Sequence, residues 1–352
     1  MRLGVFLPNW IGDVVMATPA LDSLRELAGP EGRVVGVMRP YVADVLAGLE
    51  TLDRHVFYKP RAKDRTLSGA AVIAALREER LDAVVLLTNS LRTAWLAWRS
   101  GASERIGYER DQRSWLLSTR LRDPRRRGKR APLPQIDSYL NLAYAAGGAW
   151  RSPELRLATT PQDEAAADDA WSKLGLPQGE RVVVFNTGGA YGDAKSWPAE
   201  HFAELARRLV ADEGLAVVVN CGPGERETAN RIAELAGSPA VVSLGRIDSL
   251  PIGLSKAIIR RSHLLVSTDS GPRFFGIAFG KPVVSLFGPT DPMATKTHYA
   301  HEERLSLALD CQFCWARECP LGHHNCMTEL TVARVLRAVH AALDGRSAIV
   351  AA

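Results

Sequence analysis

The feature that most constrains the fold of this chain is one pattern that occurs twice, in which short apolar runs alternate with amphipathic helical stretches. Parallel strands must be joined by crossover connections, usually helices, so this alternation predicts parallel sheets with helices on both faces. The chain has 352 residues, which is long for a single core and suits two domains of about 150 residues each. We therefore predict an α/β protein with two doubly wound, parallel-sheet domains.

The predicted elements follow from apolar periodicity, and the predicted boundary follows from a break in it. Glycine and proline interrupt the pattern between Ala146 and Gly179. We expect domains at residues 1–160 and 161–330, with a C-terminal helix and tail at 331–352 that could pack on either domain, the N-terminal one included. The predicted strands are 2–7, 34–38, 55–57, 83–87, 181–186, 216–220, 240–243, 264–267 and 283–287. The predicted helices are 14–27, 41–48, 68–79, 91–100 and 332–343, with others beginning near 199, 225 and 251.

A polar turn follows a buried strand near the C-terminal end of the chain. The apolar run 264–267 leads into Asp269-Ser270-Gly271-Pro272 and then into a short helix. Such a turn places backbone N–H groups and the positive end of a helix dipole at the edge of the sheet, where α/β proteins hold a diphosphate. The alternative is an ordinary strand-to-helix turn without a ligand.

A second turn of this kind opens the other half of the predicted C-terminal domain. The strand ending at Asn186 leads into Thr187-Gly188-Gly189, and Lys195 follows as a point charge for phosphate oxygens. The segment matches neither GxxxxGK[ST] nor GxGxxG. Further on, Glu225 and Glu227 begin a helix after another strand, and either carboxylate could hold ribose hydroxyls or simply favour the helix N-terminus.

The N-terminal strand and helix are joined by the loop Asn9-Trp10-Ile11-Gly12-Asp13. This places Asp13 at or next to the first turn of the helix. The carboxylate either caps that helix or serves as a base at the rim of a cleft.

Taken together, these motifs resemble the bacterial heptosyltransferases of glycosyltransferase family 9, which build the inner core of lipopolysaccharide. The resemblance runs from GDVVMATPAL at Gly12 through GGAYGDAKSWP at Gly188 and DSGP at Asp269 to GKPVVSLFGPTDP at Gly280 and CPLGHHNC at Cys319. The last motif is closest to the heptosyltransferase II branch. The resemblance implies a GT-B architecture, with two Rossmann-like domains facing a central cleft, the acceptor on the N-terminal domain and the nucleotide sugar on the C-terminal one.

The resemblance also implies a mechanism: metal-independent, inverting transfer of heptose from ADP-heptose, or of another sugar from its nucleotide, to the heptose/Kdo inner core. Asp13 would be the general base, and Lys195 would balance the charge on the departing diphosphate. The implied donor-binding residues are Thr187, Gly188, Glu227, Asp269, Ser270, Gly271 and Arg273. The expected acceptor-binding residues are Asn9, Trp10, Gly12, Arg61, Arg120 and Arg122.

The chain departs from the family pattern after Asp-Ser-Gly-Pro. The family has a donor-contacting histidine two residues past the proline, where this chain has Phe274. A phenylalanine cannot hydrogen-bond a sugar, so the departure concerns donor identity or activity itself. We expect Arg273 to replace the histidine as a cation near the diphosphate. The alternative is harmless divergence at a tolerant site.

The net charge of +5 is concentrated in the stretch RLRDPRRRGKR at residues 120–130, which has seven cations and one carboxylate. Such a run is a solvated loop, a nucleic-acid patch, or a site for an anionic partner. Without aromatic interleaving, an anionic lipid-linked core oligosaccharide at the inner-membrane surface fits better than a nucleic acid. No apolar run is long enough to span a bilayer and no signal peptide begins the chain, so we expect a cytoplasmic protein with peripheral membrane contact.

Four of the five cysteines cluster near the C-terminus, at Cys311, Cys314, Cys319 and Cys326. Their number permits a structural zinc site, although their spacing differs from the paired CxxC of a zinc ribbon. Free or packed thiols are the alternative, and catalysis requires no cofactor. Two other functions remain open: a nucleotide-binding module without transfer activity, and, less well supported because GxGxxG is missing, a Rossmann-type oxidoreductase.

Overall fold

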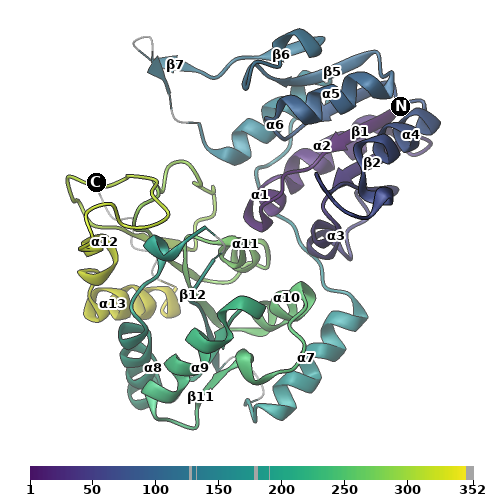
Figure 1. The fold of residues 1–352 in the computed structure, drawn as a ribbon. Helices are drawn as coiled ribbons and strands as arrows, with labels where there is room; N and C mark the ends of the chain where they lie inside the picture. The colour runs from purple at the N-terminus through teal and green to yellow at the C-terminus, as the bar shows by residue number, and fades with distance from the viewer. Residues whose placement is uncertain (127–128, 132, 178–180, 190, 346–352) are drawn as a thin grey trace. The chain divides into compact units, whose positions relative to one another are not determined.

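The computed structural model describes residues 1–126, 129–131, 133–177, 181–189 and 191–345 (Figure 1). The chain divides into two compact units. Unit 1 comprises Met1–Ala158 and Met293–His298, and unit 2 comprises Thr159–Pro292 and Tyr299–Ala352. The short segment Met293–His298 therefore belongs to the first unit although it lies late in the sequence.

Unit 1 is built on a six-stranded sheet in the order β3-β2-β1-β4-β5-β6, and every neighbouring pair is parallel. The inner strands are continuous apolar runs because both faces of a parallel sheet are covered. The strands are β1 (Arg2–Phe6), β2 (Arg33–Met38), β3 (Arg54–Phe57), β4 (Ala83–Leu86), β5 (Glu104–Tyr108) and β6 (Thr119–Leu121), and the helices are α1 (Ile11–Met16), α2 (Thr18–Ala28), α3 (Pro40–Leu46), α4 (Gly69–Glu79), α5 (Leu91–Ser100) and α6 (Gln135–Ala145).

Unit 2 repeats the same strand order, β11-β10-β9-β12-β13-β14, again with all neighbours parallel. All residues of β9, β10 and β12 are buried. The strands are β9 (Val182–Asn186), β10 (Ala216–Asn220), β11 (Val241–Ser243), β12 (Leu264–Thr268), β13 (Val283–Leu286) and β14 (Glu302–Leu305), and the helices are α7 (Pro161–Lys173), α8 (Ala199–Glu213), α9 (Arg226–Ala236), α10 (Ile252–Arg261), α11 (Gly271–Ala278), α12 (Asn325–Thr328) and α13 (Val332–Leu343).

In both units the strand order reverses at the middle of the sheet, between β1 and β4 and between β9 and β12. At such a switch point, crossovers leave in opposite directions and a crevice opens at the carboxyl ends of the two strands. The fold therefore offers one ligand-binding crevice within each unit. The prediction of two parallel, helix-covered α/β sheets is confirmed.

Several features differ from the sequence-based expectation, including the helices α6 and α7, which were not predicted. The predicted helix at 14–27 is two helices separated at Ala17, because Pro19 in the first turn of α2 has no N–H to donate to the preceding turn. Strands β5, β6 and β14 were not predicted, because charged residues interrupt their apolar pattern. Helix α13 packs on α8, β12, β13 and β14 of unit 2, which is one of the two packings that the sequence left open.

The basic run at residues 120–130 includes a small antiparallel hairpin of β7 (Arg125–Arg126) and β8 (Lys129–Arg130). Residues 127–128 of the run lie outside the described part of the chain. In the described part, no helix is both long and apolar enough to cross a bilayer.

Candidate functional site

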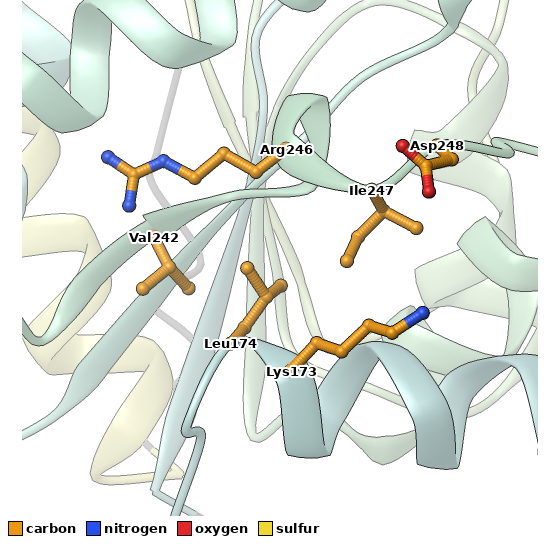
Figure 2. A pocket seen from close by; sticks show the side chains of 6 residues that line it. All are labelled: Lys173, Leu174, Val242, Arg246, Ile247 and Asp248. Atoms are coloured by element: carbon orange, nitrogen blue, oxygen red, sulfur yellow. The ribbon is translucent and has the colours of Figure 1, made fainter.

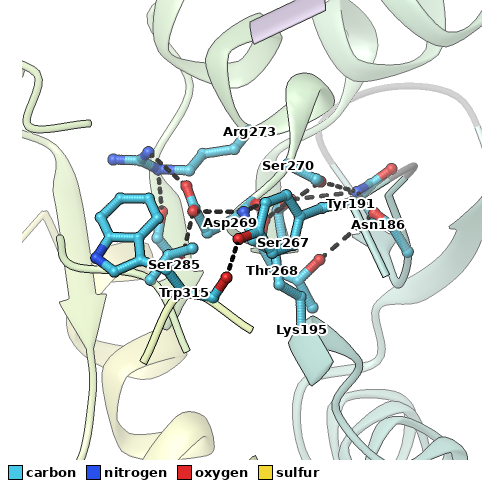
Figure 3. Close-up of polar contacts among 12 residues, drawn as sticks. Asn186, Tyr191, Lys195, Ser267, Thr268, Asp269, Ser270, Arg273, Ser285 and Trp315 are labelled. Atoms are coloured by element: carbon cyan, nitrogen blue, oxygen red, sulfur yellow. Dashed lines mark hydrogen bonds and ion pairs between the residues drawn. The ribbon is translucent and has the colours of Figure 1, made fainter. Parts of the chain in front are cut away.

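The switch point of unit 2 brings together the two turns singled out in the sequence. Asn186 ends β9 and precedes Thr187 and Gly188, while Asp269 and Ser270 follow β12 and precede α11 (Figure 3). The two strands are direct neighbours, with Ser267 of β12 in register with Asn186 of β9. The parallel register therefore places both turns at the same carboxyl edge.

The central contact at this edge is an ion pair between Lys195 and Asp269. Lys195 Nζ lies 2.8 Å from Asp269 Oδ2 and donates a second hydrogen bond of 2.8 Å to the Asp269 backbone oxygen. The side chains are 14% and 5% exposed. The ammonium also lies 4.5 Å from the ring centroid of Tyr191, a cation–π contact. Lys195 is thus a largely enclosed cation held at the end of β12.

Asp269 is buried, yet its carboxyl group stays ionised. Burial raises its pKa, but the charges of Lys195 and Arg273 outweigh that effect, so the pKa lies below its ordinary value. Thr290 supports the ionised form by donating a 2.7 Å hydrogen bond to Oδ2. The carboxylate is therefore charged at neutral pH and holds two cations in place.

Arg273 does not occupy the position that we expected. Its side chain is fully buried, with Nε 2.6 Å from Glu302 Oε1 and Nη1 3.3 Å from Asp269 Oδ1. The guanidinium also contacts the rings of Phe274 and Phe287, at 4.7 and 4.9 Å. Because these groups enclose it, Arg273 does not present a cation to a ligand in this structure. It lies behind Asp269 and links α11 to the edge strand β14.

A chain of buried amides and hydroxyls lies beside the ion pair (Figure 3). Asn186 Nδ2 donates to Ser270 Oγ at 2.7 Å, and Asn220 Nδ2 donates to Asn186 Oδ1 at 2.9 Å. Next to them, the buried hydroxyl of Thr187 forms no hydrogen bond with any described residue. A buried polar atom without a partner is costly, which marks this turn as a place where a ligand atom can bind.

Two further predicted donor residues differ in surroundings. Glu225 caps its helix, because its Oε2 accepts a 2.9 Å hydrogen bond from the Gly222 N–H. Glu227 is exposed in the first turn of α9. Of the two carboxylates, Glu225 has the structural role proposed as the alternative, and Glu227 is accessible to a ligand.

The predicted base, Asp13, is the third residue of α1 and is partly buried. Trp10, the residue that precedes the helix, makes no side-chain capping bond. Asp13 Oδ1 instead accepts a 3.0 Å hydrogen bond from the hydroxyl of Tyr139, on α6. Tyr139 was not among the residues predicted from the sequence, and nothing near Asp13 in the chain points to it.

A cavity of about 350 Å³ opens at the switch point of unit 1. It lies where β1, β2 and β4 end, and its lining is mixed, with the arginines Arg39 and Arg92 among hydroxyl and apolar groups. Arg39 Nε donates to Asn9 Oδ1 at 3.2 Å. Of the predicted acceptor residues, Asn9 lines this cavity. The other lining residues are Phe6, Leu7, Val37, Met38, Tyr58, Pro60, Thr88, Ser90 and Thr93.

The remaining predicted acceptor residues lie elsewhere on unit 1. Trp10 is 48% exposed, and Gly12 is buried inside α1. Arg61 is an exposed residue directly after the cavity-lining Pro60. Arg120 and Arg122 lie in and just after the edge strand β6, where Arg122 pairs with Glu109 at 2.8 Å. Arg39 and Arg92 were missed. Arg39 directly follows the predicted strand 34–38, the position that should have marked it, whereas Arg92 lies in the first turn of α5.

The four clustered cysteines line one small cavity of about 30 Å³ together with His323 and His324. All four cysteines are free thiols. Burial raises the pKa of the Cys326 thiol to about 11. In the described residues no group of three or more histidine, cysteine or acidic side chains could hold a metal ion, so the zinc hypothesis is not supported.

A second, open pocket of unit 2 lies between the end of α7 and the edge strand β11 (Figure 2). Lys173, Arg246 and Asp248 surround an apolar floor of Leu174, Val242 and Ile247. Lys173 is exposed and already pairs with Asp169 at 2.8 Å. This pocket contains none of the predicted site residues.

Comparison with known proteins finds relatives that match nearly the whole chain. The model of glycosyltransferase family 9 (heptosyltransferase) matches residues 70–325. Lipopolysaccharide heptosyltransferase 2 of Escherichia coli K12 is 26% identical over 367 residues, covering 97% of this chain and 99% of that protein.

Two solved structures share the fold. A family 9 glycosyl transferase from Veillonella parvula superposes with a TM-score of 0.81 at 25% identity, covering 98% of this chain and 97% of that one. The E. coli ADP-heptose LPS heptosyltransferase II superposes with a TM-score of 0.78 at 22% identity, covering 99% and 100%. The protein described here belongs to glycosyltransferase family 9, the heptosyltransferases.

Proposed function

We propose that this chain is an inverting, metal-independent glycosyltransferase that moves heptose from ADP-heptose to the heptose/Kdo inner core of lipopolysaccharide. The observation that supports this most is the enclosed Lys195–Asp269 pair at the unit 2 switch point. It combines a cation for a diphosphate with a carboxylate for sugar hydroxyls. We take ADP-heptose as the donor because one similar structure is described as an ADP-heptose LPS heptosyltransferase.

The donor's diphosphate would bind between Lys195 and the first turn of α11. Ser270 precedes this helix and its side chain makes no capping bond. Pro272 has no N–H and the Arg273 N–H donates to the Ser270 oxygen, so the N–H groups that would meet the diphosphate are those of Ser270 and Gly271. The buried Thr187 hydroxyl would gain the partner it lacks. When the sugar–phosphate bond breaks, negative charge grows on the diphosphate, and these groups stabilise it without rearranging.

The acceptor would bind to unit 1, with Asp13 taking the proton of the attacking hydroxyl. A carboxylate suits this task because it is ionised at neutral pH and needs only hydrogen-bond reach to that hydroxyl. The cavity at the unit 1 switch point supplies Arg39 and Arg92 for the acidic groups of an inner-core acceptor. Because that acceptor is anchored to lipid, the enzyme would work in peripheral contact with the inner membrane, on its cytoplasmic side.

The test is ADP release from ADP-heptose in the presence of a heptose-terminated core acceptor. Asp13→Asn should lower kcat by at least about 10²-fold, because a general base contributes about 10²–10⁴-fold. Lys195→Ala should lower it by about 10²–10³-fold, the usual effect of removing one preorganised charge-stabilising donor. Lys173→Ala is the matched control, an exposed lysine of the same unit that should leave the rate unchanged.

The outcomes also separate the alternatives. ADP release from a different nucleotide sugar, with none from ADP-heptose, would assign another donor to the same fold. ADP binding without turnover of any nucleotide sugar would make the chain a nucleotide-binding relative that has lost transfer activity. Phe274 is the residue that motivates both alternatives, and its side chain is buried against Arg273.

A further inference from the structure

The contact between Asp13 and Tyr139 joins two helices that are far apart in the sequence. Tyr139 lies on α6 and Asp13 on α1, and the two helices pack on each other. The tyrosine is 3% exposed, and its hydroxyl lies 3.0 Å from Asp13 Oδ1. Its ring is therefore held by the core of unit 1, while its one polar atom meets the carboxylate.

The direction of this hydrogen bond is set by the chemistry of the two groups. Burial, together with the adjacent carboxylate of Asp13, raises the pKa of Tyr139 well above its ordinary value. The phenol is therefore protonated at any working pH and donates, and the ionised carboxylate accepts. A hydrogen bond donated to the charged form favours that form, so this contact both orients Asp13 and favours its ionised state.

We propose that Tyr139 is a positioning residue for the catalytic base, holding Asp13 by the Oδ1 contact in one rotamer from which its carboxylate meets the acceptor hydroxyl. The inference rests on the proposed function, in which Asp13 is that base. A buried ring is suited to this task because it loses no further side-chain freedom when the acceptor binds.

Other charged groups lie on the helices that pack on α1, and any reading of the pH dependence must include them. Asp22, Arg25 and Glu26 on α2 form ion pairs with Arg156, Asp53 and Arg151, all in unit 1. The others are Tyr41 and Asp44 on α3, Asp137 and Tyr144 on α6, and Arg110, whose charge acts on Tyr139. Asp137 lies 3.2 Å from His298. Replacing Tyr139 with phenylalanine leaves all of these side chains in place.

The test is the pH profile of kcat/KM for Tyr139→Phe, which removes the hydroxyl and keeps the ring. Loss of the donor raises the pKa of the base, so the acid limb should move to higher pH by about one unit. At the plateau, kcat should fall about tenfold, while KM for ADP-heptose and for acceptor stays within about twofold, because orientation and not binding is lost. Tyr144→Phe is the control, since Tyr144 lies on the same helix and its hydroxyl bonds to the Arg151 backbone oxygen.

Asp13→Asn, measured beside these variants, separates the inference from the proposed function. An inactive Asp13→Asn with an unshifted Tyr139→Phe profile overturns the positioning role and leaves the base assignment intact. An active Asp13→Asn overturns both. If Tyr139→Phe does not fold, 3-fluorotyrosine at position 139 replaces it. This stronger donor should move the acid limb to lower pH, and an unmoved limb would refute the role.

Discussion

Replacing Arg273 with methionine tests whether the buried charges behind the donor site depend on one another. Arg273 and Glu302 have side-chain exposures of 0% and 1%, and their contact is 2.6 Å. Methionine keeps much of the side-chain volume but leaves Glu302 buried without its cation, and it removes one of the two cations beside Asp269. Breaking a buried pair in this way costs about 3–5 kcal/mol.

For a domain of 150–250 residues, a loss of that size corresponds to a fall in Tm of roughly 6–20 °C. The sharper assay is hydrogen exchange measured by mass spectrometry on peptides from β12 and β13. These peptides should lose about 3–5 kcal/mol of opening free energy, because the most protected core strands exchange only when the whole unit opens. Peptides from β1 and β2 in unit 1 provide an internal control and should be unchanged.

Two further variants define what would refute the reasoning. Arg207→Met removes an exposed pair with Glu204 and should cost less than about 1 kcal/mol. The double variant Arg273→Met/Glu302→Gln also removes the buried negative charge that faced the guanidinium, and it should recover at least about 1–2 kcal/mol. A cost for Arg273→Met as small as that of Arg207→Met, or no recovery in the double variant, would show that Glu302 and Asp269 do not need the buried guanidinium.

Three further measurements test other parts of the chain. Burial raises the pKa of Glu164, but hydrogen bonds from two arginines of α10 bring it down to about 2. Glu164→Gln should therefore lower the free energy of unfolding by about 1–2 kcal/mol in urea at pH 7. This difference should disappear as the pH falls from about 4.5 toward 2. A difference that does not depend on pH would contradict this explanation. Iodoacetamide should label Cys319 well before Cys326 in a time course followed by peptide mass spectrometry. Backbone N–H groups lower the pKa of the Cys319 thiol, whereas burial raises the pKa of the Cys326 thiol to about 11. Equal labelling rates would contradict this prediction. Gly253→Ala should cost about 1–3 kcal/mol in thermal unfolding because its Cβ would lie 1.7 Å from a carboxylate oxygen of α7, whereas Gly224→Ala, which meets open space, should be nearly neutral.

The buried strands could be predicted because a short, continuous apolar run is typical of a strand that is covered on both faces of a parallel sheet. Strands β9 and β10 were placed within one residue of their observed bounds. Strands β5, β6 and β14 could not be predicted in this way, because charged residues interrupt their apolar pattern and β14 reads EERL. The sequence pattern reports apolar residues on both faces of a strand, and a charged residue within a short strand removes that signal.

The candidate site was predictable only where its residues follow strand ends. Asp269, Lys195 and Thr187 were found because the turn after a parallel strand is a known place for ligands. The sequence did not reveal that Arg273 points into the core, because its burial depends on Glu302 in a strand that was itself missed. Tyr139 was missed for a similar reason: its contact with Asp13 arises from helix packing across 126 residues.

The assignment of Met293–His298 to unit 1 has a consequence for the order in which the chain can fold. The Ala294 carbonyl accepts a hydrogen bond from the Gln135 N–H at the start of α6, and His298 lies against Asp137, two residues further on. During synthesis, residues 1–158 are complete long before residues 293–298 are made. The first turn of α6 therefore gains this partner only after most of the chain has been made, and a fragment cut at residue 158 would leave the Gln135 N–H without it. Because α6 also carries Tyr139, the late segment completes one end of the helix that contacts Asp13.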